Sequence, residues 1–152
     1  MTDLLIRDFT DPRFQAAFQA YFQELEVRVR DWSALFREMN GENDTAWLRL
    51  AEDGAVVGFL QFQLMPVSTW FFSARWGFIR EFWVSPSYRG AGHGKALLAL
   101  AEAYFLAEGI HFSLLTTDTA PAFYEKLGYH RSGAFLPPEQ EADEIMYLKE
   151  LK

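Results

Sequence analysis

Residues 84–98 read Val84-Ser85-Pro86-Ser87-Tyr88-Arg89-Gly90-Ala91-Gly92-His93-Gly94-Lys95-Ala96-Leu97-Leu98, a strand-like run, a glycine-rich turn and the start of an apolar helix. The glycines Gly90, Gly92 and Gly94 lie where a backbone without Cβ can turn sharply and present its N–H groups. Those donors and the positive end of the helix dipole stabilise a phosphate group. A tight turn without a ligand is the alternative, but Arg89 and Lys95 beside the glycines favour phosphate binding.

The spacing of these glycines argues against the two best-known nucleotide loops. A P-loop needs a glycine five residues before its Gly-Lys pair and Ser or Thr after it, and those positions here hold Arg89 and Ala96. The dinucleotide pattern G-x-G-x-x-G also fails, because Gly94 comes one residue too early. The spacing therefore disfavours a kinase or a dehydrogenase.

The N-terminal third predicts one strand and two helices. A strand is expected over residues 4–9, and Asp11-Pro12 supplies an N-cap and a first helical residue. A second helix follows Asp31 and ends at Asn40-Gly41. Both helices carry apolar residues at helical spacing, which indicates core, with an aromatic cofactor site as the alternative. These are Phe14, Ala17, Phe18, Tyr21, Phe22 and Leu25 in the first helix, and Trp32, Leu35, Phe36 and Met39 in the second.

Two further strands are predicted over residues 46–52 and 55–64, joined by a hairpin at Asp53-Gly54. In the second of them Leu60, Phe62 and Leu64 should share one face, and Met65-Pro66 should end it. Residues 67–77 then form a predicted aromatic loop. It is a candidate substrate wall, with Trp70 and Trp76 as substrate-binding residues, or a dimer contact through Trp70, Phe71, Phe72 and Trp76.

The rest of the chain alternates strands with helices. The pattern predicts a strand over residues 78–84, a helix from the glycine turn to about Glu108, a strand over 111–116 and a short helix over 119–127 closed by Gly128. Strands over 129–134 and 144–149 follow, with a polar loop at 137–141. Hairpins mixed with strand-helix-strand crossovers indicate an α/β fold with a mixed sheet covered by helices, in a single domain over residues 1–152.

The charge and composition of the chain limit the kinds of binding partner and metal site that we expect. The net charge of −7 disfavours nucleic acid and anionic lipid, and we expect no membrane segment and a cytoplasmic protein. The chain has no cysteine, and His93, His111 and His130 have no ligand spacing, so no metal site is expected. We expect His93 at the rim of the phosphate site and the other two simply on strands.

Two motifs resemble the GNAT superfamily of N-acetyltransferases. Arg89-x-x-Gly92-x-Gly94 is similar to that family's acyl-CoA pyrophosphate loop, within a similar strand, loop and helix. Further on, residues 122–129 resemble its second motif, a short helix that ends in a Gly-aromatic pair. The motif-level similarity covers about residues 78–130. The resemblance implies a GNAT-like mixed, mostly antiparallel central sheet of about six to seven strands with about four helices, and a splay between the fourth and fifth strands.

The resemblance also implies acetyl-CoA as co-substrate. Tyr124 matches the tyrosine that lies near the coenzyme sulfur and can protonate the departing thiolate. Thr117 occupies a position where the family often has Asn, so the resemblance does not establish the coenzyme contact made there. The remaining coenzyme-binding positions implied are Phe82, Trp83, Val84, Arg89, Gly90, Ala91, Gly92, His93, Gly94 and Lys95.

Glu81 is the candidate for the other half of the proton transfer. An amine nucleophile is protonated at neutral pH, so a carboxylate that docks the ammonium and accepts its proton, directly or through water, would enable attack. A solvated partner of Arg80 is the alternative role. Strand alternation puts Glu81 and Trp83 on one face and Arg80 and Phe82 on the other.

The leading expectation is therefore an N-acetyltransferase that moves the acetyl group from acetyl-CoA to a primary amine by direct attack in a ternary complex. The acidic balance and the aromatic loop favour a small-molecule amine over a protein or peptide amine. A non-catalytic acyl-CoA-binding or sensing domain is the alternative from another class. Monomer and homodimer both stay open.

Overall fold

The structure is a computed structural model, and it describes residues 1–134 and 145–152. The predicted loop at 137–141 lies outside the described residues. Residue contacts group the chain into two compact units, Met1–Gln63 with Glu81–Ala101, and Leu64–Arg80 with Glu102–Lys152. In chain order the elements are β1 Thr2–Ile6, α1 Pro12–Glu24, α2 Trp32–Gly41, β2 Asp44–Leu50, β3 Val56–Ser68, β4 Ser73–Val84, the 3-10 turn η1 Pro86–Tyr88, α3 His93–Ala107, β5 Phe112–Thr117, α4 Pro121–Lys126, β6 His130–Ala134 and β7 Ile145–Glu150.

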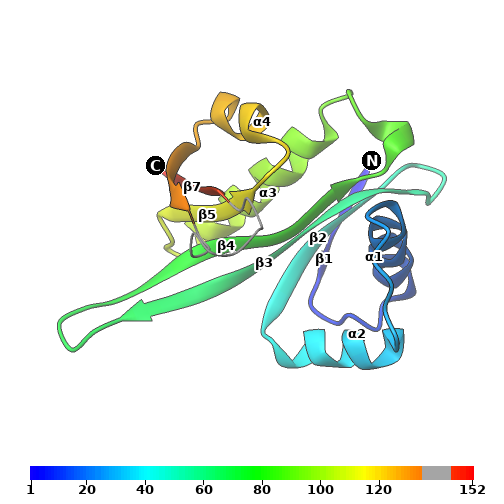
Figure 1. The fold of residues 1–152 in the computed structure, drawn as a ribbon, viewed down its shortest axis with the longest axis horizontal. Coiled ribbons are helices and arrows are strands. Elements are labelled where there is room, and N and C mark those ends of the chain that lie inside the picture. The colour runs from blue at the N-terminus through cyan, green and yellow to red at the C-terminus, as the bar shows by residue number, and fades with distance from the viewer. Residues whose placement is uncertain (135–144) are drawn as a thin grey trace. The chain divides into compact units, whose positions relative to one another are not determined.

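The strands form one seven-stranded open sheet in the order β1-β2-β3-β4-β5-β7-β6 (Figure 1). The pairs β1–β2, β2–β3, β5–β7 and β6–β7 are antiparallel, and β4–β5 is parallel. Among the described residues the parallel ladder joins only Gly77 to Ser113 and Phe78 to Leu114, although β4 continues to Val84. The predicted mixed, mostly antiparallel sheet with four helices is confirmed.

The two N-terminal helices begin where the capping residues predict. The Asp11 carboxylate accepts a hydrogen bond from the Arg13 backbone N–H at 2.9 Å, and Pro12 takes the first helical position. Asp31 accepts in the same way from the Ala34 N–H at 3.1 Å. Each cap satisfies a donor that the first helical turn cannot pair internally.

A Phe-rich core holds α1 and α2 beside β1–β3 within the first unit (Figure 1). Phe59 of β3 is fully buried, and the rings of Phe14, Phe18 and Tyr21 surround it at centroid distances of 5.3, 5.6 and 5.6 Å. Edge-on and tilted pairs at such distances stabilise beyond the area they bury. The predicted apolar stripe is thus core, except that Leu25, the C-cap residue, is exposed.

Strand β1 is displaced from its predicted range, residues 4–9, and ends at Ile6. The Asp8 side chain accepts from the Thr10 N–H at 3.0 Å, and the Phe9 N–H donates to Asn40 Oδ1 at 2.8 Å. These side-chain bonds compete with a strand ladder and turn the chain toward α1.

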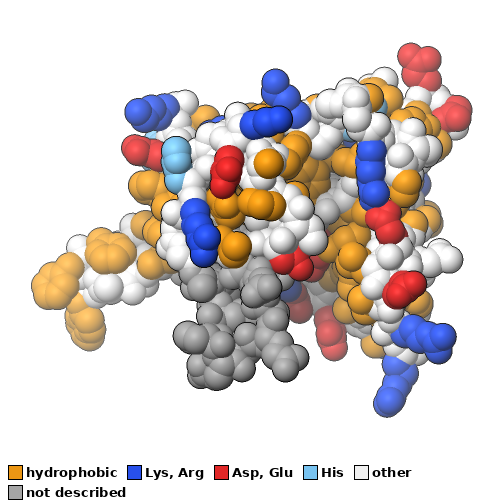
Figure 2. All heavy atoms as spheres, turned by 45° about the horizontal axis from the view of Figure 1, so that its top comes forward, with side chains coloured by type: hydrophobic (Ala, Val, Ile, Leu, Met, Phe, Trp, Pro, Cys, Tyr) orange, Lys and Arg blue, Asp and Glu red, His pale blue; other side chains and the backbone are white. Residues whose placement is uncertain are grey.

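The predicted break at Met65-Pro66 is wrong, because β3 runs on to Ser68. Its pairing with β2 ends at Gln63, so the missing N–H of Pro66 costs no hydrogen bond on that side. The predicted aromatic loop is instead the far part of a long β3–β4 hairpin. Figure 2 shows hydrophobic side chains gathered at its end.

Candidate functional site

The turn before α3 has the backbone that its glycines predict. Gly90 and Gly92 have φ values of +82° and +85°, in the left-handed region that other residues rarely adopt. A Cβ at either glycine would meet no atom within 4 Å. The glycines are therefore required for the backbone conformation of the turn and leave open space beside it, and they are not required for packing.

The first N–H groups of α3 face this opening without a helical partner. The first bond of the helix runs from the Ala96 N–H to the Gly92 carbonyl at 3.0 Å. The N–H groups of His93, Gly94 and Lys95 therefore make no helical hydrogen bond to a carbonyl one turn earlier. Together with the positive end of the α3 dipole, they form a suitable site for an anionic group.

Arg89 is engaged with protein groups at the edge of this turn. Its Nε donates to the Val84 carbonyl at 2.9 Å, and one terminal nitrogen lies 2.6 Å from both carboxylate oxygens of Glu24. The side chain, about half exposed, thus ties the turn to the end of β4 and to α1. Glu24 therefore competes with a phosphate group for the Arg89 guanidinium, which the sequence predicts as a coenzyme-binding group.

His93 points toward the strands β1 and β2. Its Nδ1 lies 3.1 Å from a terminal nitrogen of Arg49, whose guanidinium also forms a two-pronged ion pair with Asp3 at 2.8 and 3.1 Å. Because a guanidinium only donates, this contact is a hydrogen bond in the tautomer whose Nδ1 carries no proton. The ring of His93 is therefore held by an Arg49–Asp3 pair that the sequence did not reveal, and its position at the rim of a phosphate site stays a prediction.

The end of β4 lies close against β3. A Cβ added at Gly58 would collide with the backbone carbonyl of Trp83, and the Ser85 N–H donates to the Val57 carbonyl at 2.8 Å. Trp83 is buried in the core of the first unit, and its indole N–H has no partner among the described residues.

Glu81 of β4 contacts α1 within the first unit. Its Oε2 accepts a hydrogen bond of 2.5 Å from the hydroxyl of Tyr21 in α1. Short phenol–carboxylate bonds of this kind are charge-assisted and strong. The Tyr21 ring packs against Phe18, Phe22 and Phe59, so the carboxylate is held by a donor that is itself fixed. Sequence reasoning placed Tyr21 only in the core stripe and missed this contact.

Tyr124 of α4 belongs to the second unit. The residue is 9% exposed, and its hydroxyl has no hydrogen-bond partner in the part of the chain that the structure describes. Burial raises the pKa of Tyr124 to about 12, so the phenol keeps its proton at neutral pH. It can donate a hydrogen bond to a ligand without giving up an existing one.

A polar network fixes Tyr129, three residues after the end of α4. The Tyr129 hydroxyl lies 2.7 Å from Ser113 Oγ and donates to Glu102 at 2.9 Å, and Glu102 pairs with Lys149 at 2.9 Å. The Tyr129 ring meets the Tyr124 ring edge-on at 5.8 Å, and its N–H donates to the Tyr124 carbonyl at 3.1 Å. The network thus anchors one side of Tyr124, and no spacing rule in the sequence could have found it.

The remaining predicted residues have mainly structural surroundings. Thr117 is buried, and its hydroxyl accepts from the Ala120 N–H at 3.2 Å, closing the turn into α4. Trp76 packs on Phe112 at 5.7 Å, whereas Trp70 is fully exposed at the hairpin end. His111 and His130 are exposed near or on strands.

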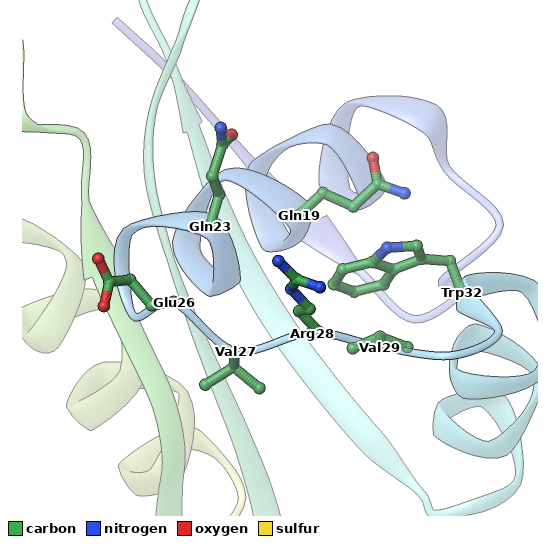
Figure 3. Close-up of a pocket in the computed structure, with 7 residues that line it drawn as sticks. All are labelled: Gln19, Gln23, Glu26, Val27, Arg28, Val29 and Trp32. Atoms are coloured by element: carbon green, nitrogen blue, oxygen red, sulfur yellow. The ribbon is translucent and has the colours of Figure 1, made fainter.

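A large open pocket is lined by α1, the segment that follows it and the start of α2 (Figure 3). It has a volume of about 830 Å³ and is lined by Gln19, Gln23, Glu26, Val27, Arg28, Val29 and Trp32. Gln19 and Gln23 are one turn apart on one face of α1, whereas Tyr21, two residues from each, points the other way. The pocket is thus separate from the Tyr21–Glu81 pair.

Neither a metal-binding cluster nor a membrane-spanning helix is found among the described residues. Residues 1–134 and 145–152 contain no group of three or more His, Cys, Asp or Glu side chains placed to hold a metal ion. No helix in that same part of the chain combines the length and the apolar character needed to cross a membrane.

Comparison with known proteins completes the description. No curated protein matches the chain. Among solved structures, an aminoglycoside 6'-acetyltransferase type Ii is 21% identical with a TM-score of 0.74, over 99% of this chain and 97% of that one. A GNAT-family acetyltransferase from Staphylococcus aureus Mu50 is 18% identical with a TM-score of 0.70, over 99% and 100%. A chain of the NatC complex bound to Gag peptide and CoA is 17% identical with a TM-score of 0.70, over all of both chains.

At these identities the solved structures establish the fold. A sequence model of the acetyltransferase (GNAT) family matches residues 1–129, which include every residue of the candidate site. The chain therefore belongs to the GNAT family of acetyltransferases.

Proposed function

We propose that this chain is a single acetyltransferase domain that transfers the acetyl group of acetyl-CoA to a primary amine. The observation that carries the proposal is the turn at Gly90 and Gly92, whose left-handed backbone leaves open space before the unpaired N–H groups of α3. The pyrophosphate of the coenzyme is the anionic group that this turn would bind. Family membership supports the same assignment.

Glu81 supplies the base in this proposal. Its carboxylate, oriented by the Tyr21 hydroxyl, docks the ammonium form of the acceptor and takes one proton from it, directly or through water. The neutral amine then attacks the thioester carbonyl carbon, the new N–C bond forms and the C–S bond breaks. The second amine proton passes, directly or through water, to the departing thiolate, so that CoA leaves as the thiol.

Tyr124 stabilises the leaving sulfur. Its pKa of about 12 lies well above that of an ordinary thiol, about 8.5, so complete proton transfer to the thiolate is unfavourable. The phenol instead donates a hydrogen bond as negative charge develops on the sulfur. Direct attack needs no acyl-enzyme, and the chain has no cysteine to form one.

We favour a small cationic amine as the acceptor and the cytoplasm as the location of the protein. The net charge of −7 attracts such a molecule, and one structural neighbour is an aminoglycoside acetyltransferase. A peptide amine is the second candidate acceptor, supported by the likeness to a chain of the peptide-bound NatC complex.

A thiol-release assay with acetyl-CoA and a panel of small amines and peptides tests the proposal. We expect amine-dependent release of CoA by the wild-type protein and a fall of about 10²–10⁴-fold for Glu81→Gln, which keeps the size and an acceptor oxygen for Tyr21. Acetyl-CoA binding without turnover on any acceptor would instead favour the non-catalytic acyl-CoA-binding domain.

A further inference from the structure

The glycine turn before α3 has no side-chain contacts of its own at its centre. Gly90 and Gly92 carry no side chain, and a Cβ at either would meet no atom within 4 Å. A glycine-rich backbone also has more conformational freedom to lose than any other. The order of this turn therefore depends largely on the residues that flank the glycines.

Two rings close the turn at its base. The rings of Tyr88 and His93, which stand just before Arg89 and just after Gly92, meet edge-on with their centroids 6.0 Å apart. His93 is also the first residue of α3, so its position helps to fix where the first N–H groups of that helix lie. A contact that holds the His93 ring therefore holds the groups proposed to bind the pyrophosphate.

Arg49 attaches the His93 ring to the sheet of the first unit. One terminal nitrogen of Arg49, in β2, lies 3.1 Å from Nδ1 of His93. Nε and the second terminal nitrogen donate to the two carboxylate oxygens of Asp3, at 2.8 and 3.1 Å. Asp3 lies directly opposite Arg49 in the β1–β2 ladder, so the strand register sets this ion pair. Because Asp3 holds the planar guanidinium at two points, its remaining nitrogen faces His93 in a fixed direction.

This attachment is more sheltered from water than the one at the other end of the turn. The side chain of Arg49 is 14% exposed, whereas that of Arg89, which binds Glu24, is 50% exposed. Water and salt screen an exposed ion pair, which therefore contributes little to order. Arg49 thus provides the firmer of the two attachments.

We propose that Arg49, oriented by Asp3, is a positioning residue of the coenzyme site, which holds the His93 ring and so keeps the unpaired N–H groups of α3 in place for the pyrophosphate. The inference rests on the proposed function, because it assumes that this turn binds the coenzyme. Order that exists before the ligand arrives lowers the entropic cost of binding. Arg49 therefore acts on coenzyme affinity through His93.

Calorimetric titration of the full chain with CoA, for variants of Arg49 and His93, tests the proposal. Arg49→Lys keeps the positive charge but loses the planar fork that joins Asp3 to His93. We expect the Kd for CoA to rise about three- to tenfold. His93→Leu should raise the Kd to a similar extent. The double variant should bind no more weakly than either single variant, because both changes break the same link.

Arg13→Lys is the matched control. Arg13 forms the same kind of two-pronged ion pair, with Asp11 before α1, at 3.1 and 2.8 Å. Its replacement should leave the Kd for CoA unchanged. The phosphorus NMR spectrum of bound CoA gives a second readout that a general loss of stability would not move. The pyrophosphate signals should shift in Arg49→Lys relative to the wild type and stay in place in Arg13→Lys.

Wild-type affinity and unchanged pyrophosphate signals in Arg49→Lys would overturn the proposal, because the fork would then have no role. Fully additive losses in the double variant would also overturn it, since Arg49 and His93 would then act independently. An equal loss in Arg13→Lys would reduce the effect to the general loss of an ion pair. If Arg49→Lys does not fold, a folded His93→Leu variant with wild-type affinity overturns the proposal. A wild-type protein that binds no CoA would instead contradict the proposed function itself.

Discussion

The hydroxyl of Tyr21 lies 2.5 Å from Oε2 of Glu81, although the two residues are 60 positions apart in the chain. This bond joins α1 to the strand that ends in the glycine turn. It fixes the orientation of the half-buried carboxylate that we propose as the base. The orientation of Glu81, the candidate base, therefore depends on α1 as well as on β4.

Replacing Tyr21 with Phe removes the hydroxyl and keeps the ring in the aromatic core. We expect kcat to fall about tenfold, because the carboxylate is no longer held in one orientation, while the affinity for acetyl-CoA stays the same. Steady-state kinetics with both substrates measures the effect. Tyr104→Phe, a half-buried tyrosine of α3, is the control, and an equal loss in both variants would refute a specific role for Tyr21.

Gly92→Val should abolish coenzyme binding while the protein stays folded. A β-branched residue is strongly disfavoured at a φ of +85°, and its side chain would fill the space before the first turn of α3. We expect the Kd for acetyl-CoA to rise at least about tenfold. Gly41→Ala, at an open helical position without a positive φ, should bind normally. Unchanged affinity of Gly92→Val would exclude the turn as the pyrophosphate site.

Tyr124→Phe should lower the rate without weakening acetyl-CoA binding. The ring contacts with Phe123 and Tyr129 are kept, and only the buried hydroxyl is lost. A hydrogen bond made mainly to developing charge affects kcat and not ground-state affinity, so we expect a fall of about 10–10²-fold in kcat. A variant with wild-type turnover would remove Tyr124 from the reaction.

Tyr124 should also make the fold sensitive to alkali. Its pKa is about 12 in the folded protein and about 10 in an unfolded chain, so above pH 10 the unfolded state loses a proton that the folded state retains. The free energy of unfolding therefore falls as pH rises, by up to about 3 kcal/mol between pH 10 and 12. Burial raises the pKa of Tyr129 in the same direction. Urea unfolding at pH 9 and 11 should show a smaller loss for Tyr124→Phe than for the wild type, and equal losses would contradict the assignment.

Local signals in the sequence predicted much of this fold. Asp11 and Asp31 begin their helices as expected, and the glycine turn adopts the conformation that Gly90 and Gly92 allow. These features depend on neighbours a few residues away, so a single sequence carries them. The long hairpin was missed because Pro66 was interpreted as a strand end, whereas strand pairing on that side stops at Gln63.

The contacts that complete the candidate site could not be predicted in this way. Tyr21 reaches Glu81, and Arg49 reaches His93, across 60 and 44 residues. Tyr21 lies on the core face of α1 by its spacing, and nothing in a helical pattern distinguishes a tyrosine that only packs from one that also donates. Such pairs depend on the register of the sheet, which fixes which distant residues meet.

Calorimetric titration of the purified protein with acetyl-CoA, and with free CoA as a control, tests the central claim most directly. The account predicts saturable binding of both ligands, because the pyrophosphate that the Gly90–Gly92 turn would hold is common to them. Absence of heat together with absence of a thermal shift would mean that the turn binds no coenzyme, and the proposed acetyl transfer would be contradicted.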